Sequence, residues 1–369
     1  MIYYYHLLLF MPVSFEEIKN ILGKKDAKYL LDFDNPKIDK QQLHAPTPRH
    51  VEKIFAASDR NKKVIANLKK LYSHGRLGNT GYFSILPVDQ GIEHSAGARF
   101  STNPEYFDPE RVVKLAVEAG CSGIASTLGI LGLVSGRYAD RIPYILKLNH
   151  NDLLRYPNDH DQIMFASVHQ AYNMGARGVG ATIYFGSVES KRQIDEVGEA
   201  FEEAHRLGMF TVLWCYVRNP AFVVGKKDYN ESSDLTGQAN YIGVTLGADI
   251  IKQKLPTCNG GYKTLNTAKV HFGKFEERMY TDLTSDHPID MCRYQVLNCF
   301  SGRIGMISSG GAHGKDDLHD AVYEAVINKR AGGQGLVMGR KAFERPFEEG
   351  VKILHAVQDV YLCNEVTIV

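Results

Sequence analysis

Short apolar, β-branched segments alternate with amphipathic segments through most of the chain after residue 81. Eight of these apolar segments fit buried strands, at residues 83–89, 122–127, 144–149, 178–186, 210–218, 248–254, 303–310 and 333–340. The stretches between them repeat apolar residues every three or four positions, as helices do, and several end in glycine just before the next strand. Because eight strands that alternate with helices are typical of a (β/α)8 TIM barrel, we expect this α/β fold class.

A doubly wound open sheet is the alternative arrangement of the same elements. That fold would place a glycine-rich phosphate-binding fingerprint directly after the first strand. The sequence at 87–94 is PVDQGIEH, which is not such a fingerprint. The barrel therefore remains the expected fold.

The segment before the first strand has a different character. Residues 14–79 are polar and helical in pattern, and a single apolar stripe runs through Val64, Ile65, Leu68 and Leu71. Gly75 is a suitable stop for this helix. We therefore predict an N-terminal extension at 1–80 that packs on a catalytic barrel domain at 81–369.

The first thirteen residues, MIYYYHLLLFMPV, are apolar, as in the core of a secretory signal peptide. They lack the basic start and the small-residue cleavage site that a signal peptide usually has. They are also too short to span a bilayer. Translation from Met11 would explain this segment, and residues 1–10 would then be absent from the mature chain.

Composition narrows the possible functions. The 369 residues contain 43 Lys and Arg against 42 Asp and Glu, and this balance argues against a general surface for nucleic acid. The six cysteines form no CxxC pair, so neither a disulfide framework nor a zinc site is indicated, and we expect a cytoplasmic protein.

In a barrel the chemistry belongs at the carboxyl ends of the strands. The strand around GADIIKQK places Lys252 and Lys254 on one face and Gln253 on the other. A lysine inside a barrel loses hydration, which lowers its pKa and leaves an amine that can attack a carbonyl. The alternative is a structural lysine paired with a carboxylate such as Asp89. Lys147 is a second interior lysine, so spacing alone does not choose between the two.

Two glycine-rich segments follow the last two strands. SSGGAHG begins at Ser308, and MGRKAF contains Gly339 and Arg340. Loops after strands seven and eight of a barrel often bind phosphate, with backbone N–H groups and an arginine as donors. Tight turns without a ligand are the alternative interpretation of these glycines.

Other polar side chains lie at strand ends. Asp89 and His94 follow the first strand, and no HxxxH or HExxH pattern supports a metal site there. Trp214, Tyr216 and Arg218 alternate along the fifth strand and share one face, either as core packing or as a phenol and an arginine near the lysine.

Six segments in this order closely resemble the DhnA-type class I fructose-1,6-bisphosphate aldolases of bacteria, relatives of the archaeal class I enzymes. These segments are PVDQGIEHSAG, ATIYFGS, LWCYVRN, ADIIKQK, SSGGAHG and GLVMGRKAF. The resemblance extends from about Leu71 to the C-terminus. It implies a TIM barrel that reversibly cleaves fructose 1,6-bisphosphate to dihydroxyacetone phosphate and glyceraldehyde 3-phosphate in glycolysis and gluconeogenesis. It further implies no metal or other cofactor, and a homo-oligomer.

The family's functional residues carry over position by position. The Schiff-base lysine falls on Lys252, the proton-transferring tyrosine on Tyr216 and the strand-one aspartate on Asp89. The implied substrate-binding residues are Trp214, Arg218, His94, Ser309, Gly310, Gly311, Gly339 and Arg340. The sequence departs from the archaeal form at Gln90 and Gln253, which fits the bacterial subgroup and leaves fine sugar specificity open.

Three alternatives remain. Another Schiff-base aldolase or transaldolase-like enzyme for a different phosphorylated keto compound would share the lysine, tyrosine and aspartate. An FMN-dependent barrel oxidoreductase would share the two glycine loops but would not need Lys252. A non-catalytic phosphosugar-binding barrel would bind ligand without turnover. The segment 256–288 is a candidate lid over the mouth, and it or Arg218 would bind a second phosphate.

Overall fold

The structure, a computed structural model, describes residues 14–266, 272–273, 275–311 and 314–369. The expectations about residues 1–10 and about a start at Met11 lie outside the described residues.

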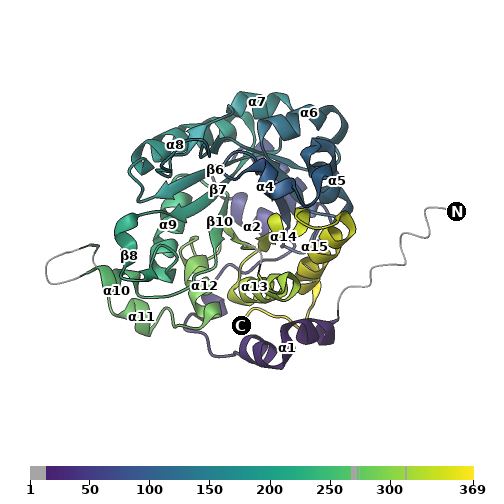
Figure 1. Ribbon diagram of the computed structural model, residues 1–369. Coiled ribbons are helices and arrows are strands. Elements are labelled where there is room, and N and C mark those ends of the chain that lie inside the picture. Colours follow the sequence, from purple (N-terminus) through teal and green to yellow (C-terminus); the bar gives the residue numbers. More distant parts are fainter. Residues whose placement is uncertain (1–13, 267–271, 274, 312–313) are drawn as a thin grey trace.

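Eight parallel strands close into a barrel in the order β1-β12-β11-β10-β7-β6-β3-β2 (Figure 1). These strands are β1 (Ile85–Val88), β2 (Gly123–Ser126), β3 (Tyr144–Lys147), β6 (Gly178–Phe185), β7 (Phe210–Val217), β10 (Ile250–Lys254), β11 (Gly305–Ser309) and β12 (Gly335–Val337). All eight lie within the segments expected from the sequence, so the predicted (β/α)8 barrel is confirmed. Two short ribbons join it, β4 (Asn149–His150) with β5 (Ile163–Met164) and β8 (Val223–Val224) with β9 (Lys227–Asp228).

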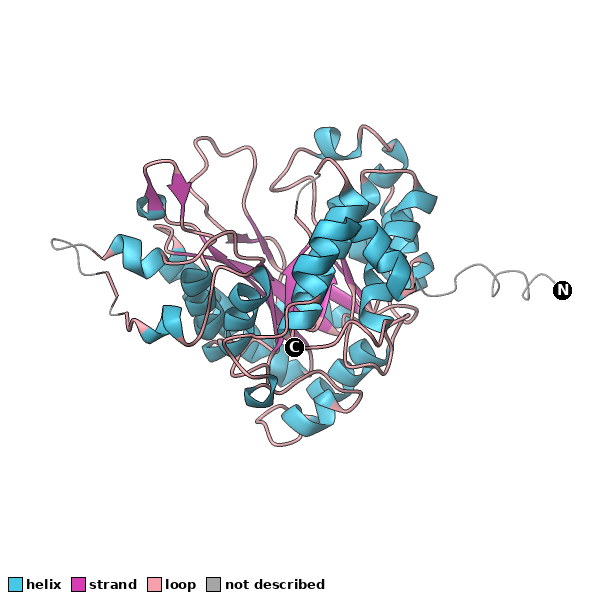
Figure 2. Ribbon diagram, turned by 90° about the horizontal axis from the view of Figure 1, so that it is seen from below, coloured by secondary structure: helices cyan, strands magenta, loops and turns pink. Residues whose placement is uncertain are grey.

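Helices surround the strands, as Figure 2 shows. Those between and after the barrel strands are α4 (Ala96–Phe100), α5 (Pro109–Glu118), α6 (Leu128–Tyr138), α7 (Val168–Asn173), α8 (Ser190–Leu207), α9 (Ser233–Thr245), α10 (Gly261–Leu265), α11 (Arg278–Thr281), α12 (Pro288–Leu297), α13 (Asp317–Ala331), α14 (Arg340–Phe343) and α15 (Phe347–Leu362). Side-chain oxygens cap several of these helices; Asp108, for example, accepts a hydrogen bond from the backbone N–H of Glu110 at the start of α5. No helix in the described part of the chain is long and apolar enough to cross a bilayer.

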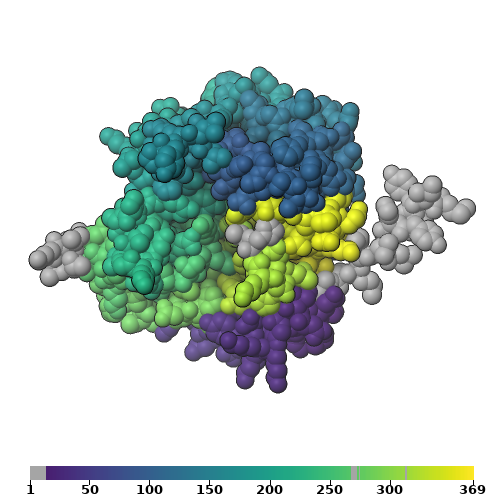
Figure 3. Space-filling view, viewed as in Figure 1, coloured from purple at the N-terminus to yellow at the C-terminus, as the bar shows by residue number. Residues whose placement is uncertain are grey.

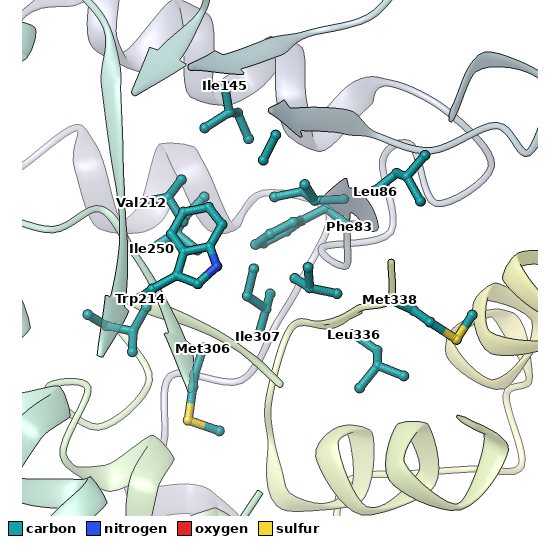
Figure 4. Close-up of a cluster of buried hydrophobic side chains, with 14 of the residues drawn as sticks. Phe83, Leu86, Ile145, Val212, Trp214, Ile250, Met306, Ile307, Leu336 and Met338 are labelled. Atoms are coloured by element: carbon teal, nitrogen blue, oxygen red, sulfur yellow. The ribbon is translucent and has the colours of Figure 1, made fainter. Parts of the chain in front are cut away.

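The barrel interior is filled by apolar side chains from facing strands. Ile145, Val212, Ile250 and Ile307 are buried there, and Trp214 lies among them (Figure 4). The indole fits because the facing residue is Gly180, where an added Cβ would lie 2.6 Å from the Trp214 ring. Close packing at this level leaves the polar side chains to the strand ends above it.

The N-terminal helices pack on the barrel. They are α1 (Phe15–Leu31), α2 (His50–Phe55) and α3 (Lys62–Ser73). α3 lies at the amino ends of the strands, where Asn67 donates a hydrogen bond to Gly208 O before β7 and Tyr72 donates one to Gln334 before β12. The predicted stripe is confirmed at Val64, Leu68 and Leu71, which are fully buried, whereas Ile65 is half-buried. The opposite end of the barrel therefore remains available for a ligand.

We expect Gly335→Ala to destabilise the barrel at its closing strand. A methyl group at this position would lie 2.1 Å from the Phe83 carbonyl oxygen, a backbone atom that cannot swing aside. The expected loss is about 3 kcal/mol in the free energy of unfolding, measured by chemical denaturation. Gly198→Ala in α8 is the matched control, because its Cβ meets no atom within 4 Å and should stabilise the helix by about 0.5–1 kcal/mol. Equal stability of the two variants would contradict the packing argument.

Candidate active site

A cavity of about 770 Å³ opens at the carboxyl ends of the barrel strands, where Figure 3 shows the surface hollowed near its centre. Every site residue expected from the sequence lines this cavity: Asp89, His94, Trp214, Tyr216, Arg218, Lys252, Ser309, Gly310, Gly311, Gly339 and Arg340. Residues on or directly after five different strands therefore meet around one space.

Lys252 lies on the inner face of β10, as strand alternation predicts. Its neighbour Gln253 points outward and donates a hydrogen bond of 2.9 Å to Asn240 on α9. Lys254 shares the inner face but reaches the rim, where its amine forms an ion pair with Glu231. Of the two residues, only Lys252 is buried, with 6% of its surface exposed.

The amine of Lys252 has an environment that favours its neutral form. Nζ donates a hydrogen bond of 2.5 Å to the Tyr216 hydroxyl and lies 5.4 Å from the centre of the Trp214 ring. Burial lowers the pKa of Lys252 to about 8, although the charge of Asp89 opposes this shift. No carboxylate of the described residues lies within 4 Å of this amine. A useful fraction of neutral amine is therefore present near neutral pH.

Lys147 differs from Lys252 although both side chains enter the barrel. Its amine donates to Asn149 O at 2.8 Å and lies 3.9 Å from a carboxylate oxygen of Asp89 and 3.9 Å from one of Glu93. The sequence left open whether Lys252 forms a structural ion pair with a carboxylate such as Asp89. In the structure it is Lys147 that has this role. The sequence could not separate the two lysines, because their partners come from other strands.

Asp89 keeps its charge in this setting. Burial acts to raise its pKa, but the charge of Lys147, followed by other cationic groups, lowers it below the ordinary value overall. An ionised carboxylate beside the cavity can accept a proton from a ligand hydroxyl. His94, by contrast, has a pKa lowered by burial and by the charge of Arg340, so it is a neutral imidazole near pH 7.

Tyr216 remains a neutral phenol. Burial raises its pKa, while a hydrogen bond with Ser309 and the charge of Lys254 act in the opposite direction. The Arg218 guanidinium lies 5.6 Å from the centres of the Tyr216 and Tyr184 rings, so it is held at the cavity wall by cation–π contacts. A phenol in contact with the Lys252 amine can pass a proton to and from groups formed there.

Glu93 is a cavity residue to which the sequence gave no role. It accepts hydrogen bonds from the Tyr184 hydroxyl at 3.0 Å, from Gln162 at 2.9 Å and from the Asn151 backbone at 3.3 Å. It therefore joins the loop after β1 to the segment after β3 and to β6 itself. The sequence signal for it was weak, since it consisted only of a position next to His94.

The two glycine loops meet beside the cavity, but not all of their N–H groups are free. Gly310 N–H donates to Val337 O at 2.8 Å, so it is not available to a phosphate in this arrangement. Arg340 donates to Gly311 O at 3.2 Å and holds the loops together. Gly339 is required for the close approach of the second loop to β1, because a Cβ there would lie 2.3 Å from Pro87 O.

The predicted lid is only partly described, since residues 267–271 and 274 lie outside the described residues. Pro256 and Thr257 at its start and Pro288 at its end line the cavity. Between them, the backbone N–H groups of Gly261 and Tyr262 on α10 donate to Asp234 on α9. The described middle of the segment is therefore held against α9, and closure over the mouth stays a prediction.

The described residues contain no group of three or more His, Cys, Asp or Glu side chains placed to hold a metal ion. Among the described ionisable side chains, that of Tyr216 contacts the Lys252 amine, and the charges of Asp89, Arg340 and Glu93 act on its pKa.

Several known proteins have sequences similar to that of this chain. The chain is 57% identical over 351 residues to a probable class 1 fructose-bisphosphate aldolase of Chlamydia pneumoniae. This match covers 95% of this chain and 99% of that protein. It is 29% identical to a class 1 fructose-bisphosphate aldolase of Thermoproteus tenax, over 75% of this chain and 88% of that one.

A solved structure adds independent support. An archaeal fructose-1,6-bisphosphate aldolase with its catalytic lysine bound to a carbinolamine intermediate is 27% identical, with a TM-score of 0.59 and coverage of 80% of this chain and 99% of that one. The family model for DeoC/LacD aldolases matches residues 83–345, which include the barrel from β1 to β12. The chain therefore belongs to the DeoC/LacD family of aldolases.

Proposed function

We propose that this protein is a class I fructose-bisphosphate aldolase that cleaves fructose 1,6-bisphosphate to dihydroxyacetone phosphate and glyceraldehyde 3-phosphate through a Schiff base on Lys252. The observation that carries the proposal is a buried lysine amine, free of any described carboxylate contact, in hydrogen-bond contact with a phenol at the mouth of a barrel. The relatives named as class 1 fructose-bisphosphate aldolases support the choice of substrate.

The first half of the reaction makes the electron sink. The neutral Lys252 amine attacks C2 of the ketose, and a carbinolamine forms. Tyr216 supplies the proton with which the C2 hydroxyl leaves as water, and a protonated iminium remains. Its positive charge develops beside the face of Trp214, whose ring lies 5.4 Å from the amine and favours a cation.

The second half breaks the carbon chain. Asp89, which is ionised, accepts the proton of the C4 hydroxyl, the C3–C4 bond breaks and its electron pair moves into the iminium to give an enamine. Glyceraldehyde 3-phosphate leaves, C3 of the enamine takes up a proton, and water releases dihydroxyacetone phosphate and regenerates the amine. No metal ion is needed, because the iminium supplies the electron sink.

The phosphates would bind at two sides of the cavity. Ser309, Gly311, Gly339 and Arg340 offer a hydroxyl, backbone N–H groups and a guanidinium for one phosphate. Arg218, which lines the cavity directly after β7, would bind the other phosphate. His94 and Trp214 complete the wall between these two sides.

We further propose that the protein acts in the cytoplasm as a homo-oligomer. Five of the six cysteines are buried and all six are free thiols, which suits a reducing compartment. Large apolar side chains are exposed at Leu133, Leu154, Tyr156 and Val188, with 77–94% of their surface accessible. Contact between copies of the chain would remove such apolar side chains from water.

Trapping with dihydroxyacetone phosphate and borohydride, with a chelator present throughout, should attach the reduced adduct to the peptide that contains Lys252. Lys252→Met should abolish both the adduct and turnover, because among the described lysines Lys252 is the one whose amine forms a hydrogen bond with the Tyr216 hydroxyl. Lys254→Met, which alters the neighbouring rim lysine, should retain the adduct. An adduct that maps to Lys147, or turnover without any adduct, would refute the proposed chemistry.

The rate of adduct formation should rise with pH and level off above about 8. Only the unprotonated amine attacks, and burial lowers the pKa of Lys252 to about 8, so below that value the rate should increase about tenfold per pH unit. Rapid-mixing kinetics of adduct formation would measure this profile. A midpoint near the ordinary lysine value of about 10.4 would show that the amine is not desolvated.

Tyr216→Phe should lower kcat by roughly 10²–10⁴-fold, the effect of losing one acid–base group. Steady-state kinetics with fructose 1,6-bisphosphate provide the measurement. Tyr184→Phe is the matched control, because its hydroxyl donates to Glu93 and not to the lysine, so its loss should be less than about tenfold. Similar rates for Tyr216→Phe and wild type would reassign Tyr216 to packing.

A further inference from the structure

We propose that Glu324 takes up a proton when a phosphate group binds at Ser309–Gly311. Binding of phosphorylated ligands therefore weakens as the pH rises. The proposal rests on the proposed function in one respect, namely that this loop receives a phosphate. Glu324 belongs to α13, which is outside the barrel motifs that the sequence singles out.

The geometry places this acid directly beneath the glycine loop. Glu324 lines the cavity, and a Cβ built on Gly311 would lie 3.1 Å from its Oε1. Gly311 in turn accepts a hydrogen bond from Arg340 through its carbonyl oxygen. A carboxyl group therefore lies within a few ångströms of the donors that we assign to the phosphate.

The charges around Glu324 only partly balance the negative charge of its carboxylate form. Lys341 of α14 is almost fully buried, with its amine 3.5 Å from Oε1, and it forms an ion pair with the acid. Asp320 and Asp317 of the same helix add negative charge, although Arg345 pairs with Asp317 at 2.6 Å. From α1, which packs along α13, Asp26 faces His319 and not Glu324. Among the described residues, none donates a hydrogen bond to Oε2.

This environment raises the pKa of Glu324 to about 7, because burial outweighs the attraction of Lys341. The side chain is thus close to half protonated at neutral pH. A phosphate dianion a few ångströms away repels the carboxylate and tolerates the neutral acid, so phosphate binding draws a proton onto Glu324. By linkage, deprotonation of Glu324 weakens phosphate binding by the same factor.

Sulfate is the probe that isolates this effect, because it stays a dianion across the range in which phosphate itself titrates. Calorimetry on the wild-type chain between about pH 6 and about pH 8.5 should show the Kd for sulfate rising about tenfold. In buffers of different ionisation enthalpy, binding at about pH 7.5 should take up a fraction of one proton. The measurement needs no turnover, so absent aldolase activity would count against the proposed function alone.

Glu324→Gln keeps the shape of the side chain and removes its titration. Because Lys252 also titrates in this range, the informative quantity is the difference between wild type and this variant. The variant should lose most of the pH dependence of the Kd for sulfate and of the proton uptake. Asp320→Asn removes an acid one turn earlier on α13 and should keep both, with the midpoint slightly lower, because the charge of Asp320 helps to raise the pKa of Glu324.

Equal pH dependence in wild type and Glu324→Gln would overturn the proposal, as would sulfate binding without proton uptake or no sulfate binding at all. If Glu324→Gln does not fold, infrared difference spectra of the wild-type chain decide. Sulfate added at about pH 7.5 should then convert a carboxylate band into a protonated carboxyl band, and no such change would equally refute the proposal.

Discussion

A lysine amine held out of water, with no carboxylate from the described part of the chain in contact, is the constraint around which this molecule is organised. Burial lowers the pKa of Lys252 to about 8, and a nearby acid in direct contact would reverse that shift. The cavity nevertheless contains two acids, Asp89 and Glu93. Both lie 3.9 Å from the amine of Lys147, whereas they act on Lys252 only through their charge, from beyond ion-pair distance. Two similar side chains thus have different states: one is paired with the acids, and the other is left with a phenol as its partner.

The fold makes this arrangement rigid. Apolar side chains fill the barrel below the lysine, α3 lies at the amino ends of the strands, and Lys252 lines the cavity at the mouth. Trp214 has room for its ring only because Gly180 faces it. Since core packing of this density allows little adjustment, the distances between amine, phenol and carboxylate are set by the scaffold and not by the ligand.

Burial acts on both kinds of ionisable group in the cavity. It lowers the pKa of a base, Lys252, to about 8 and raises the pKa of an acid, Glu324, to about 7, so each has a larger neutral fraction near pH 7 than it would have in water. The net charge of the cavity therefore changes between about pH 7 and about pH 8. Lys252 changes its charge beside the reacting carbonyl group, and Glu324 changes its charge beside the glycine loop. Asp89 is the exception, because Lys147 keeps it ionised, and an ionised acid is what proton abstraction requires.

The sequence by itself determined the barrel fold and a set of residues that line the cavity at its mouth. Apolar runs located all eight strands, the two-residue period of a strand put Lys252 and Gln253 on opposite faces, and the motifs identified residues that all line one cavity. The tertiary structure decided which interior lysine is paired with acids, that Gly310 N–H is already bonded, and that Glu93 and Glu324 line the cavity. The physical reason is that pKa values and free donors depend on distances of a few ångströms between strands and helices far apart in the chain, whereas periodicity reports only which way each side chain points from its own element.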